Sequence, residues 1–272
     1  MLYIKSTDKR KTYTAHQVLI SDHTPDGDIF VPVRLPNFTE KELSAIYSLG
    51  FSGAIAHILN IFFSKKIKES TIKALIDSVY PSSSLLDRKT LLISFDDRAL
   101  DLENNIYKIL TESGNQPTLW ARCAIRIGVL FGIYSELLRC GIYHADLAVD
   151  TENFERFISV FYAKLMGLPI RNIIIGSTKE DSIWNYLHKG VNISDDLLRY
   201  FVYGLSFASN ESTDVSDLFS SIISTERMKE IINGVQRSYK KEIDLPTACA
   251  YGALQDFRAL TGKNNITVII CN

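Results

Sequence analysis

Apolar residues recur at the three- and four-residue spacing of a helix face in the first third of the chain. Three successive stretches carry this pattern, at residues 41–50, 53–64 and 66–80, after an irregular start rich in turn residues. Thr39 is followed three residues later by Glu42, a spacing typical of a capping box, so we expect a helix to begin there. Residues 1–85 are therefore predicted to form a helical N-terminal region.

The pattern changes after "YPSSSLLDRKT", where a proline and three serines follow a helical stretch. Three short apolar runs, rich in β-branched residues or leucine, then predict strands, namely "TLLISF" at 90–95, "NIIIG" at 172–176 and "ITVIIC" at 266–271. Residues 118–141 lie between the first two runs and predict a long helix with apolar residues on most faces. This alternation predicts an α/β sheet in residues 86–272, with the domain boundary at 85.

The stretch from 149 to 190 predicts a loop, a helix, a strand and a second helix. We expect the first helix to end at Gly167, and the second to begin at Thr178 and end at Gly190. Residues 209–225 are polar and serine-rich and predict a loop before a helix at 226–239. In open α/β proteins the loop that precedes such a helix often meets a ligand.

Charge and cysteine content narrow the possible partners. The 272 residues include 30 basic and 31 acidic side chains, a net charge of -1, which argues against nucleic acid or an anionic membrane as partner. The four cysteines are scattered without zinc-ligand spacing, so we expect no metal site and a reducing cytoplasm; they are Cys123, Cys140, Cys249 and Cys271. No signal peptide and no membrane span is predicted.

Several side chains of catalytic types are better explained as surface or structural groups. The lysines that could replace a Schiff-base residue lie in polar or helical contexts typical of solvated surface; they are Lys66, Lys89, Lys164 and Lys179. His57 and His188 lie in helical patterns, and His144 and Asp146 lack a nucleophile or a third partner. They are predicted to be packing, surface or loop residues.

Two further segments resemble ligand loops. Ser177 and Thr178 could receive an anion at a helix N-terminus, but Glu180 and Asp181 already supply negative charge there, so we interpret the segment as a helix cap. "SGNQP" at 113–117 is similar to a substrate-binding serine loop, but its proline and its place after a helix favour a turn.

Several segments, in a co-linear order, resemble threonine synthase, a fold-type II pyridoxal-phosphate enzyme. "PDGDIFVP" is similar to the family's "PDGGLYVP", "FYAKLMGLPI" to "YYAKKMGLPI", and "IDLPTACAYGALQDF" to "DPHTAVAYAAL". "SFDDRALDLENNIYKIL" and "TLWARCAIRIGVLFGIYSELL" resemble two further family segments more weakly. The resemblance implies a reduced remnant of the fold-type II, tryptophan synthase β-like, three-layer α/β domain.

The departures from the family pattern bear on function. The family's catalytic lysine lies in a phrase like "HGPTLAFKD", which is absent here, as is the "TSGDTG" loop. The chain passes from "DSVYPSSSLLD" directly to "KTLLISFDD", as if a central block had been excised. The chain also ends at Asn272, before the family's segment that contacts the pyridine nitrogen. We therefore assign no catalytic residue.

The family's phosphate loop, "PTGNFGD", corresponds here to "DTENFER". Glu152 and Glu155 stand at the two glycine positions, so the loop loses positive φ and close backbone approach to an anion. At ~5 Å and an effective dielectric of ~20, each carboxylate would repel a phosphate charge by about 3 kcal/mol. We therefore expect no bound cofactor, and interpret the loop as vestigial; it comprises Thr151, Glu152, Asn153, Phe154 and Glu155.

Two functional hypotheses follow. The first is a non-catalytic binding, regulatory or structural protein that has lost the lysine and the phosphate loop. The second is a pyridoxal-phosphate-dependent lyase of the threonine synthase type, acting on O-phosphohomoserine or a related amino acid and completed by a partner chain. The apolar segment "RIGVLFGIYSELL" at 126–138 has few polar positions for a solvated face, so we also expect a homodimer or a protein partner.

Overall fold

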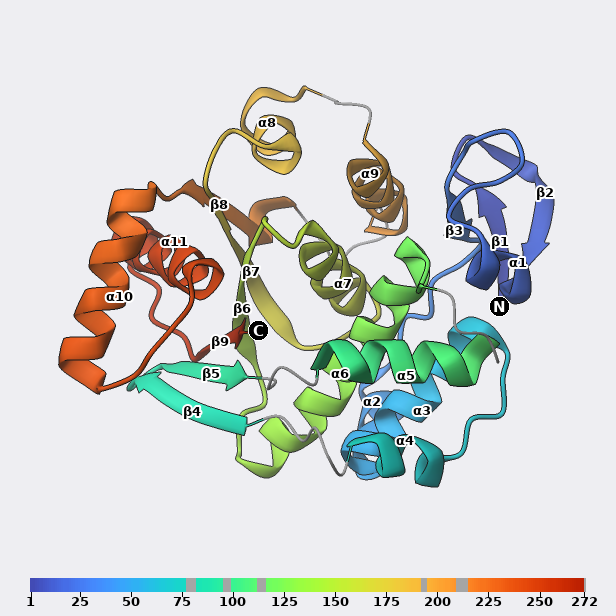
Figure 1. Ribbon diagram of the computed structural model, residues 1–272, viewed down its shortest axis with the longest axis horizontal. Helices are drawn as coiled ribbons and strands as arrows, with labels where there is room; N and C mark the ends of the chain where they lie inside the picture. The colour runs from blue at the N-terminus through green and yellow to red at the C-terminus, as the bar shows by residue number, and fades with distance from the viewer. Residues whose placement is uncertain (77–81, 95–98, 112–115, 192–194, 209–214, 272) are drawn as a thin grey trace.

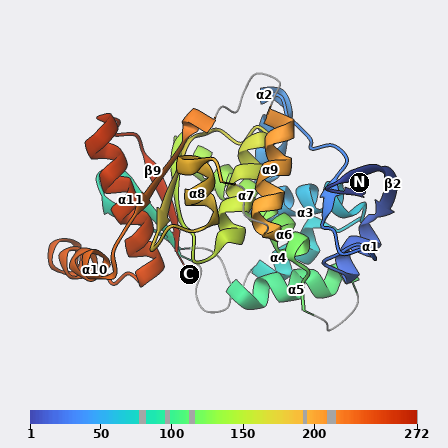
Figure 2. The same ribbon diagram turned by 90° about the horizontal axis from the view of Figure 1, so that it is seen from above.

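The chain folds, in a computed structural model, into a small antiparallel sheet, a group of helices and a larger mixed sheet (Figure 1). The structure describes residues 1–76, 82–94, 99–111, 116–191, 195–208 and 215–271. The small sheet and the helix pair α10 (Thr225–Tyr239) and α11 (Leu245–Thr261) lie at opposite ends of the molecule in both views (Figures 1 and 2).

The N-terminal region begins as a sheet rather than as the irregular entry to a helical region. Its strands are arranged in the antiparallel order β2-β1-β3, with bounds β1 (Leu2–Lys5), β2 (Asp8–Thr14) and β3 (Phe30–Pro32). Helix α1 (Ala15–Ile20) follows β2. The periodicity missed β2 because it is an exposed edge strand with four charged residues, and its only buried residue is Tyr13.

A group of helices follows this sheet. They are α2 (Glu40–Ser48), α3 (Gly50–Phe63), α4 (Glu69–Ile76), α5 (Ala99–Thr111) and α6 (Leu119–Arg139). The capping box is confirmed: the Thr39 amide donates to Glu42 Oε2 at 2.8 Å, and the Glu42 amide donates to Thr39 Oγ1 at 3.4 Å. Both bonds satisfy donors that the first turn of α2 would otherwise leave unpaired.

Helix α6 runs through the middle of the molecule. Fourteen of its residues are buried, including Phe131 and Tyr134, and it packs against α2, α3, α5 and α7 (Phe154–Leu165). The premise that this apolar helix presents an uncovered face is therefore wrong, because other helices of the same chain cover it. None of the helices in the described part of the chain is long and apolar enough to cross a membrane.

The larger sheet has the strand order β4-β5-β9-β6-β7-β8 and is parallel except at the β4–β5 pair. The predicted strands are confirmed as β5 (Thr90–Ser94), β7 (Ile170–Ser177) and β9 (Thr267–Cys271). The sequence pattern missed the other three, β4 (Ser82–Asp87), β6 (Ala145–Asp150) and β8 (Leu218–Ile222). The expected loop at 209–225 thus contains strand β8. Asp146, which was expected to be a loop residue, lies in strand β6.

Helices cover both faces of this sheet, which gives the three-layer α/β arrangement expected from the sequence. Alternate strand residues face opposite sides: Val149 joins the core under α6 and α7 (Phe154–Leu165), whereas Ala148 joins the core under α10 (Thr225–Tyr239) and α11 (Leu245–Thr261). Figure 2 shows α11 and α7 on opposite sides of the strands. The parallel strands are buried by these two layers.

The expected domain boundary at residue 85 falls inside β4. Leu86 is fully buried beneath α10 and α11, whereas Leu85 is 63% exposed, so the two residues face opposite sides of a strand. One hydrophobic core contains residues from both sides of this position, for example Phe62 and Val149. The division into 1–85 and 86–272 remains a prediction.

The helix ends around the central loop are largely as expected. Gly167 has a positive φ of 97° just after α7, and Gly190 has a φ of 65° at the end of α8 (Ser182–Lys189). Thr178 was predicted as the N-cap of α8, which is wrong: Asp181 caps it by accepting the Trp184 amide at 2.9 Å. An ionised carboxylate at this position also complements the helix dipole. Helix α9 (Asp196–Ala208) completes the set.

Trp120 lies at the meeting point of five elements. Its ring on α6 is 1% exposed and contacts the rings of Tyr3 on β1, Phe62 on α3, Tyr162 on α7 and Tyr200 on α9. The indole N–H donates to Tyr3 Oη at 3.2 Å, and that hydroxyl donates to the Phe62 carbonyl at 2.9 Å. The small sheet is thereby joined to the helices that cover the large one.

Candidate functional site

The loop after β6 lies at the carboxyl edge of the large sheet. Helix α7 leads from β6 to β7 on one face, whereas β9, on the other side of β6, is reached through α11 on the opposite face. Crossovers that leave to opposite faces create a crevice outside the carboxyl ends of neighbouring strands, where open α/β proteins bind ligands. The fold therefore places the loop at 150–155 where a ligand site is expected.

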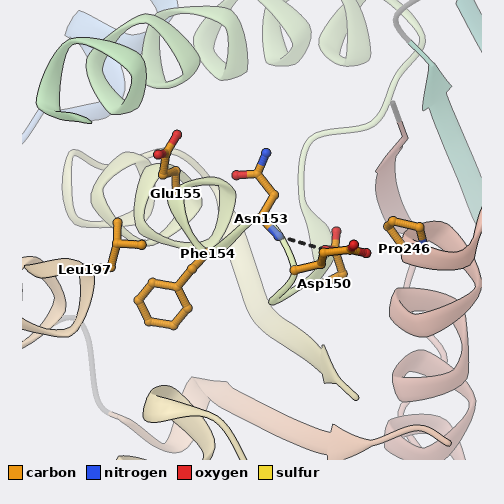
Figure 3. Close-up of a pocket in the computed structure, with 7 residues that line it drawn as sticks. Asp150, Asn153, Phe154, Glu155, Leu197 and Pro246 are labelled. Carbon is orange, nitrogen blue, oxygen red and sulfur yellow. Dashed lines mark hydrogen bonds between the residues drawn. The ribbon is translucent and has the colours of Figure 1, made fainter. Parts of the chain in front are cut away.

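A cavity of about 470 Å³ borders this loop. Its lining comes from the loop, from the start of α9 and from the N-terminus of α11; the residues are Asp150, Glu152, Asn153, Phe154, Glu155, Leu197 and Pro246. Figure 3 shows Asn153 and Glu155 on one side of the loop and Phe154 pointing to the other. Four of the five predicted loop residues thus line one cavity, and the fifth, Thr151, lies beside it.

Asp150 is a buried residue among those that line the cavity. Its side chain is 2% exposed, and its Oδ2 accepts a hydrogen bond from Arg156 Nη1 at 2.9 Å. Its Oδ1 accepts the backbone amide of Asn153, the N-cap of α7, at 3.1 Å, as Figure 3 shows. The protein's own carboxylate therefore occupies a donor at the helix end that an anion would otherwise use.

Glu155 lies in the first turn of α7 and forms ion pairs with two arginines of α6. Its Oε1 accepts from Arg122 Nη2 at 2.7 Å, and its Oε2 accepts from Arg122 Nε at 2.9 Å. Arg126 Nη1 donates to the same Oε2 at 3.1 Å and to Asn153 Oδ1 at 2.8 Å. Glu103 of α5 accepts from Arg126 Nε at 2.6 Å. The four charged groups join three helices at the cavity.

The remaining loop residues differ in their surroundings. The Thr151 amide donates to the Gly176 carbonyl at 2.9 Å, and its hydroxyl donates to Asp181 Oδ2 at 2.5 Å, which ties the loop to β7 and to the start of α8. Glu152 is exposed, and none of the described arginines forms an ion pair with it. The two glutamates of the loop are thus unlike: Glu155 is neutralised, whereas Glu152 faces solvent.

Cys249 lies on the first turns of α11 and is buried. Burial raises the pKa of the Cys249 thiol to about 12, and the charges of Asp150 and Asp181 act in the same direction. A thiol with such a pKa stays protonated at neutral pH and is a poor nucleophile. Cys249 is 2% exposed and packs α11 against the sheet.

The lysines considered from the sequence do not line the cavity. Lys66, Lys89 and Lys179 are exposed, as expected. Lys164 was expected on the solvated surface, which is wrong: its side chain is 8% exposed, and its ammonium donates to the Arg171 carbonyl at 2.8 Å and pairs with Asp217 at 3.1 Å. It lies near the end of α7, whereas the cavity borders the start of that helix.

The other candidates from the sequence have structural surroundings. Asp146 is buried and accepts hydrogen bonds from the amide and the side chain of Asn172 at 3.1 and 2.6 Å, while His144 is exposed. His57 is exposed on α3, and His188 bonds to Ser220 Oγ at 2.8 Å. Most of the segment at 113–117 lies outside the described residues. Among the described residues, no cluster of His, Cys, Asp or Glu side chains could hold a metal ion.

Comparisons with known proteins point to one family of folds. The family model "Threonine synthase N terminus" matches residues 2–80. A crystal structure of threonine synthase from Escherichia coli superposes with a TM-score of 0.76 at 12% sequence identity, over 100% of this chain and 88% of that one. The chain is threonine synthase-like in fold.

Two further structures agree. A PLP-bound threonine synthase from Brucella melitensis gives a TM-score of 0.78 at 12% identity, over 100% of this chain and 88% of that one. Threonine synthase from yeast gives 0.70 at 13% identity, over 99% of this chain and 86% of that one. A search of curated protein sequences found no match. At these identities the likeness establishes the α/β fold of this threonine synthase-like chain.

The residues around the cavity do not fit a phosphate-bearing cofactor such as pyridoxal phosphate. The lining includes three acidic residues, Asp150, Glu152 and Glu155, and no lysine is among the lining residues that the structure describes. Arg122 and Arg156 already donate to carboxylates of the protein. In this threonine synthase-like chain the cavity therefore lacks free cationic side chains among its described lining, and we derive no reaction step through the cofactor.

The arginine pair of α6 was not singled out in the sequence. Arg122 and Arg126 are four residues apart and therefore lie on the same face of their helix, in a segment otherwise dominated by apolar residues. Two like charges at this spacing on a buried helix require an anionic partner. That signal was available, but only the fold identifies Glu155 and Glu103 as the partners.

Proposed function

We propose that this threonine synthase-like chain is a non-catalytic protein that acts in binding, regulation or structure. One observation carries the proposal: the cavity beside the segment that resembles the family's phosphate loop is lined by Asp150, Glu152 and Glu155. In enzymes that use such a cofactor, the cofactor supplies the chemistry and the protein supplies its anchor and orientation. A cavity with three carboxylates and no lysine among its described lining provides neither.

The absence from the sequence of the "HGPTLAFKD"-like phrase supports the same proposal. A Schiff base with the cofactor needs a lysine amine within reach of the carbonyl group. Lys164 is held by the Arg171 carbonyl and by Asp217 near the other end of α7, so it is not available for that role. We propose that a central block with the lysine has been lost during evolution.

The alternative is a pyridoxal-phosphate-dependent lyase of the threonine synthase type that a partner chain completes. It is supported by the superposition on a PLP-bound threonine synthase over the full length of this chain. The partner would have to supply the lysine and offset the charge of Glu152, because Asp150 and Glu155 are already paired with arginines of this chain. Its substrate would be O-phosphohomoserine or a related amino acid.

Titration of the purified protein with pyridoxal phosphate tests the proposal, with absorbance and borohydride trapping as readouts. We expect scattered, substoichiometric labelling of exposed lysines such as Lys66 and Lys179. A stoichiometric adduct on one lysine, with phosphate release from O-phosphohomoserine, would contradict the proposal and favour the lyase. Repeating both assays with the protein co-purified from its native cell tests whether a partner chain supplies the missing lysine.

We further propose that the protein works in the cytoplasm, with a second copy or another protein as partner. The near-zero net charge gives no long-range attraction to nucleic acid or to an anionic membrane. Isolation of the native protein followed by mass spectrometry of its companions would identify such a partner. Recovery of nucleic acid or membrane lipid instead would contradict this part of the proposal.

A further inference from the structure

Three guanidinium N–H groups converge on one carboxylate beside the cavity. Arg122 Nε and Nη2 approach the two oxygens of Glu155 at 2.9 and 2.7 Å, and Arg126 Nη1 approaches the second oxygen at 3.1 Å. The side chains of Arg122 and Arg126 are 31% and 17% exposed. A fork of this kind binds the oxygens of a carboxylate or a phosphate through parallel hydrogen bonds.

We propose that Arg122 and Arg126 form an anion-binding clamp whose resident ligand is the protein's own Glu155. The clamp has the chemistry of a site for a small oxyanion such as inorganic phosphate. In the wild-type protein the Glu155 carboxylate occupies the clamp and thereby prevents a free anion from binding to the two arginines. If this carboxylate were removed, a free anion from solution could bind to Arg122 and Arg126.

The charges of the cluster support this assignment. Arg122 and Arg126 carry two positive charges, and Glu103 and Glu155 carry two negative charges, so the cluster is neutral as built. Without Glu155 it would carry one net positive charge, partly buried and next to a cavity. Charged groups in such surroundings are costly without a partner, which favours the uptake of an anion from solvent.

The supports of the clamp do not depend on Glu155. Glu103 on α5 holds Arg126 through Nε–Oε1 and Nη2–Oε2 hydrogen bonds of 2.6 and 3.3 Å. The other amino group of Arg122 donates to the Pro117 carbonyl. Both guanidinium groups therefore keep a fixed partner when Glu155 is removed, and the donors that faced it become available.

The proposal assigns different roles to the two glutamates at the family's glycine positions. Glu155 contacts both arginines, whereas Glu152 is exposed and pairs with none of the described arginines. Repulsion alone would make the two carboxylates equivalent obstacles to an anion. If the clamp is occupied instead, Glu155 is the residue that prevents an anion from binding, and Glu152 has little effect. Glu152→Ala is therefore the matched control for Glu155→Ala.

The test compares the melting temperatures of wild type, Glu155→Ala and Glu152→Ala in inorganic phosphate and in chloride of equal ionic strength. We expect phosphate to stabilise Glu155→Ala with an affinity at least about tenfold above that of the other two proteins. Glu155→Gln, which keeps the clamp filled with an uncharged side chain, should show no such gain. Equal stabilisation of all four proteins, or of none, would overturn the proposal.

A second variant keeps the experiment decisive if Glu155→Ala is weakly folded. Arg122→Gln combined with Glu155→Ala removes two of the three converging donors, so the phosphate effect should fall at least about tenfold. Retention of the effect in this double variant would overturn the clamp.

The inference rests on the proposed function in one respect only. Both hold that the cavity of the wild-type protein does not bind the phosphate group of a cofactor. A cofactor adduct in wild type would refute that function, whereas the variants with inorganic phosphate would still decide the clamp.

Discussion

Gly176 shows how closely the layers approach at the level of a single residue. A Cβ atom at this position of β7 would lie 2.5 Å from the carbonyl oxygen and 3.0 Å from the sulfur of Cys249 on α11. The nearest obstacle is backbone, which cannot rotate away as a flexible side chain can. Only glycine allows α11 to lie this close to the sheet at the edge that carries the cavity.

Gly176→Ala should lower the free energy of unfolding by about 1–3 kcal/mol, because the helix and the strand must separate. The matched control is Gly234→Ala in α10, where a Cβ would meet no atom within 4 Å. This control should raise the free energy of unfolding by about 0.5–1 kcal/mol, since alanine is the better helix former. Urea denaturation of both variants measures the difference, and equal effects would contradict the close approach.

Asp28 couples stability to pH at the residue scale. Burial acts to raise the pKa of its carboxyl, but hydrogen bonds from Thr7 and Ser6 outweigh it and hold the pKa below its ordinary value of 3.8. Arg199 of α9 also pairs with this carboxylate. Because the folded pKa is depressed, its contribution to stability is present above the unfolded pKa and is lost as pH falls through the folded pKa.

Asp28→Asn should therefore lower stability at pH 7 and flatten the decline in stability below about pH 4. The measurement is the free energy of unfolding of wild type and variant between pH 7 and about pH 2.5. Parallel pH profiles for the two proteins would show that Asp28 does not carry this part of the acid sensitivity.

At the scale of elements, strands with continuous apolar runs were predictable and the others were not. β7 is the clearest case, because Ile173, Ile174 and Ile175 are buried on both faces and no polar residue interrupts them. β6 was missed because Asp146 and Asp150 stand in it. Both are satisfied by Asn172 and Arg156, partners that only the fold brings close.

The sequence pattern was most misleading at β4. Three serines after a proline are typical of a linker between domains, but this segment forms a strand. Its two leucines provide a test. Leu86→Ala should cost about 2–5 kcal/mol, because it empties a site in the core under α10 and α11. Leu85→Ala should change the free energy of unfolding by less than about 0.5 kcal/mol, because that side chain is 63% exposed. Equal tolerance of both substitutions would indicate a linker.

At the scale of the whole molecule, the loop at 150–155 was predictable from its resemblance to the family, but the charge balance around it was not. The sequence argument treated Glu152 and Glu155 as two like obstacles to a phosphate. The fold separates them, because α6 brings Arg122 from more than thirty positions upstream to neutralise Glu155 alone. A local sequence pattern carries no information about such a long-range ion pair.

Self-association also belongs to this scale and remains a prediction. Helix α6 is covered within the chain. One candidate surface is the sheet edge at β4, which pairs with β5 alone among the described strands and carries the exposed Leu85, so a second copy could pair there. We expect sedimentation velocity at high micromolar concentration to show a dimer, and Leu85→Lys to shift it toward monomer. A monomeric wild-type protein under these conditions would contradict the prediction.

The position of Trp120 allows its fluorescence to report on how the small sheet is attached to the rest of the molecule. The chain has two tryptophans, and Trp120 is shared by β1, α3, α6, α7 and α9, whereas Trp184 stands apart on α8 beside His188. Detachment of the small sheet would hydrate the first indole and leave the second unchanged. The emission spectrum of a Trp184→Phe protein would then report Trp120 alone, and a red shift at lower urea than the loss of helical circular dichroism would mean that the small sheet detaches before the helices unfold.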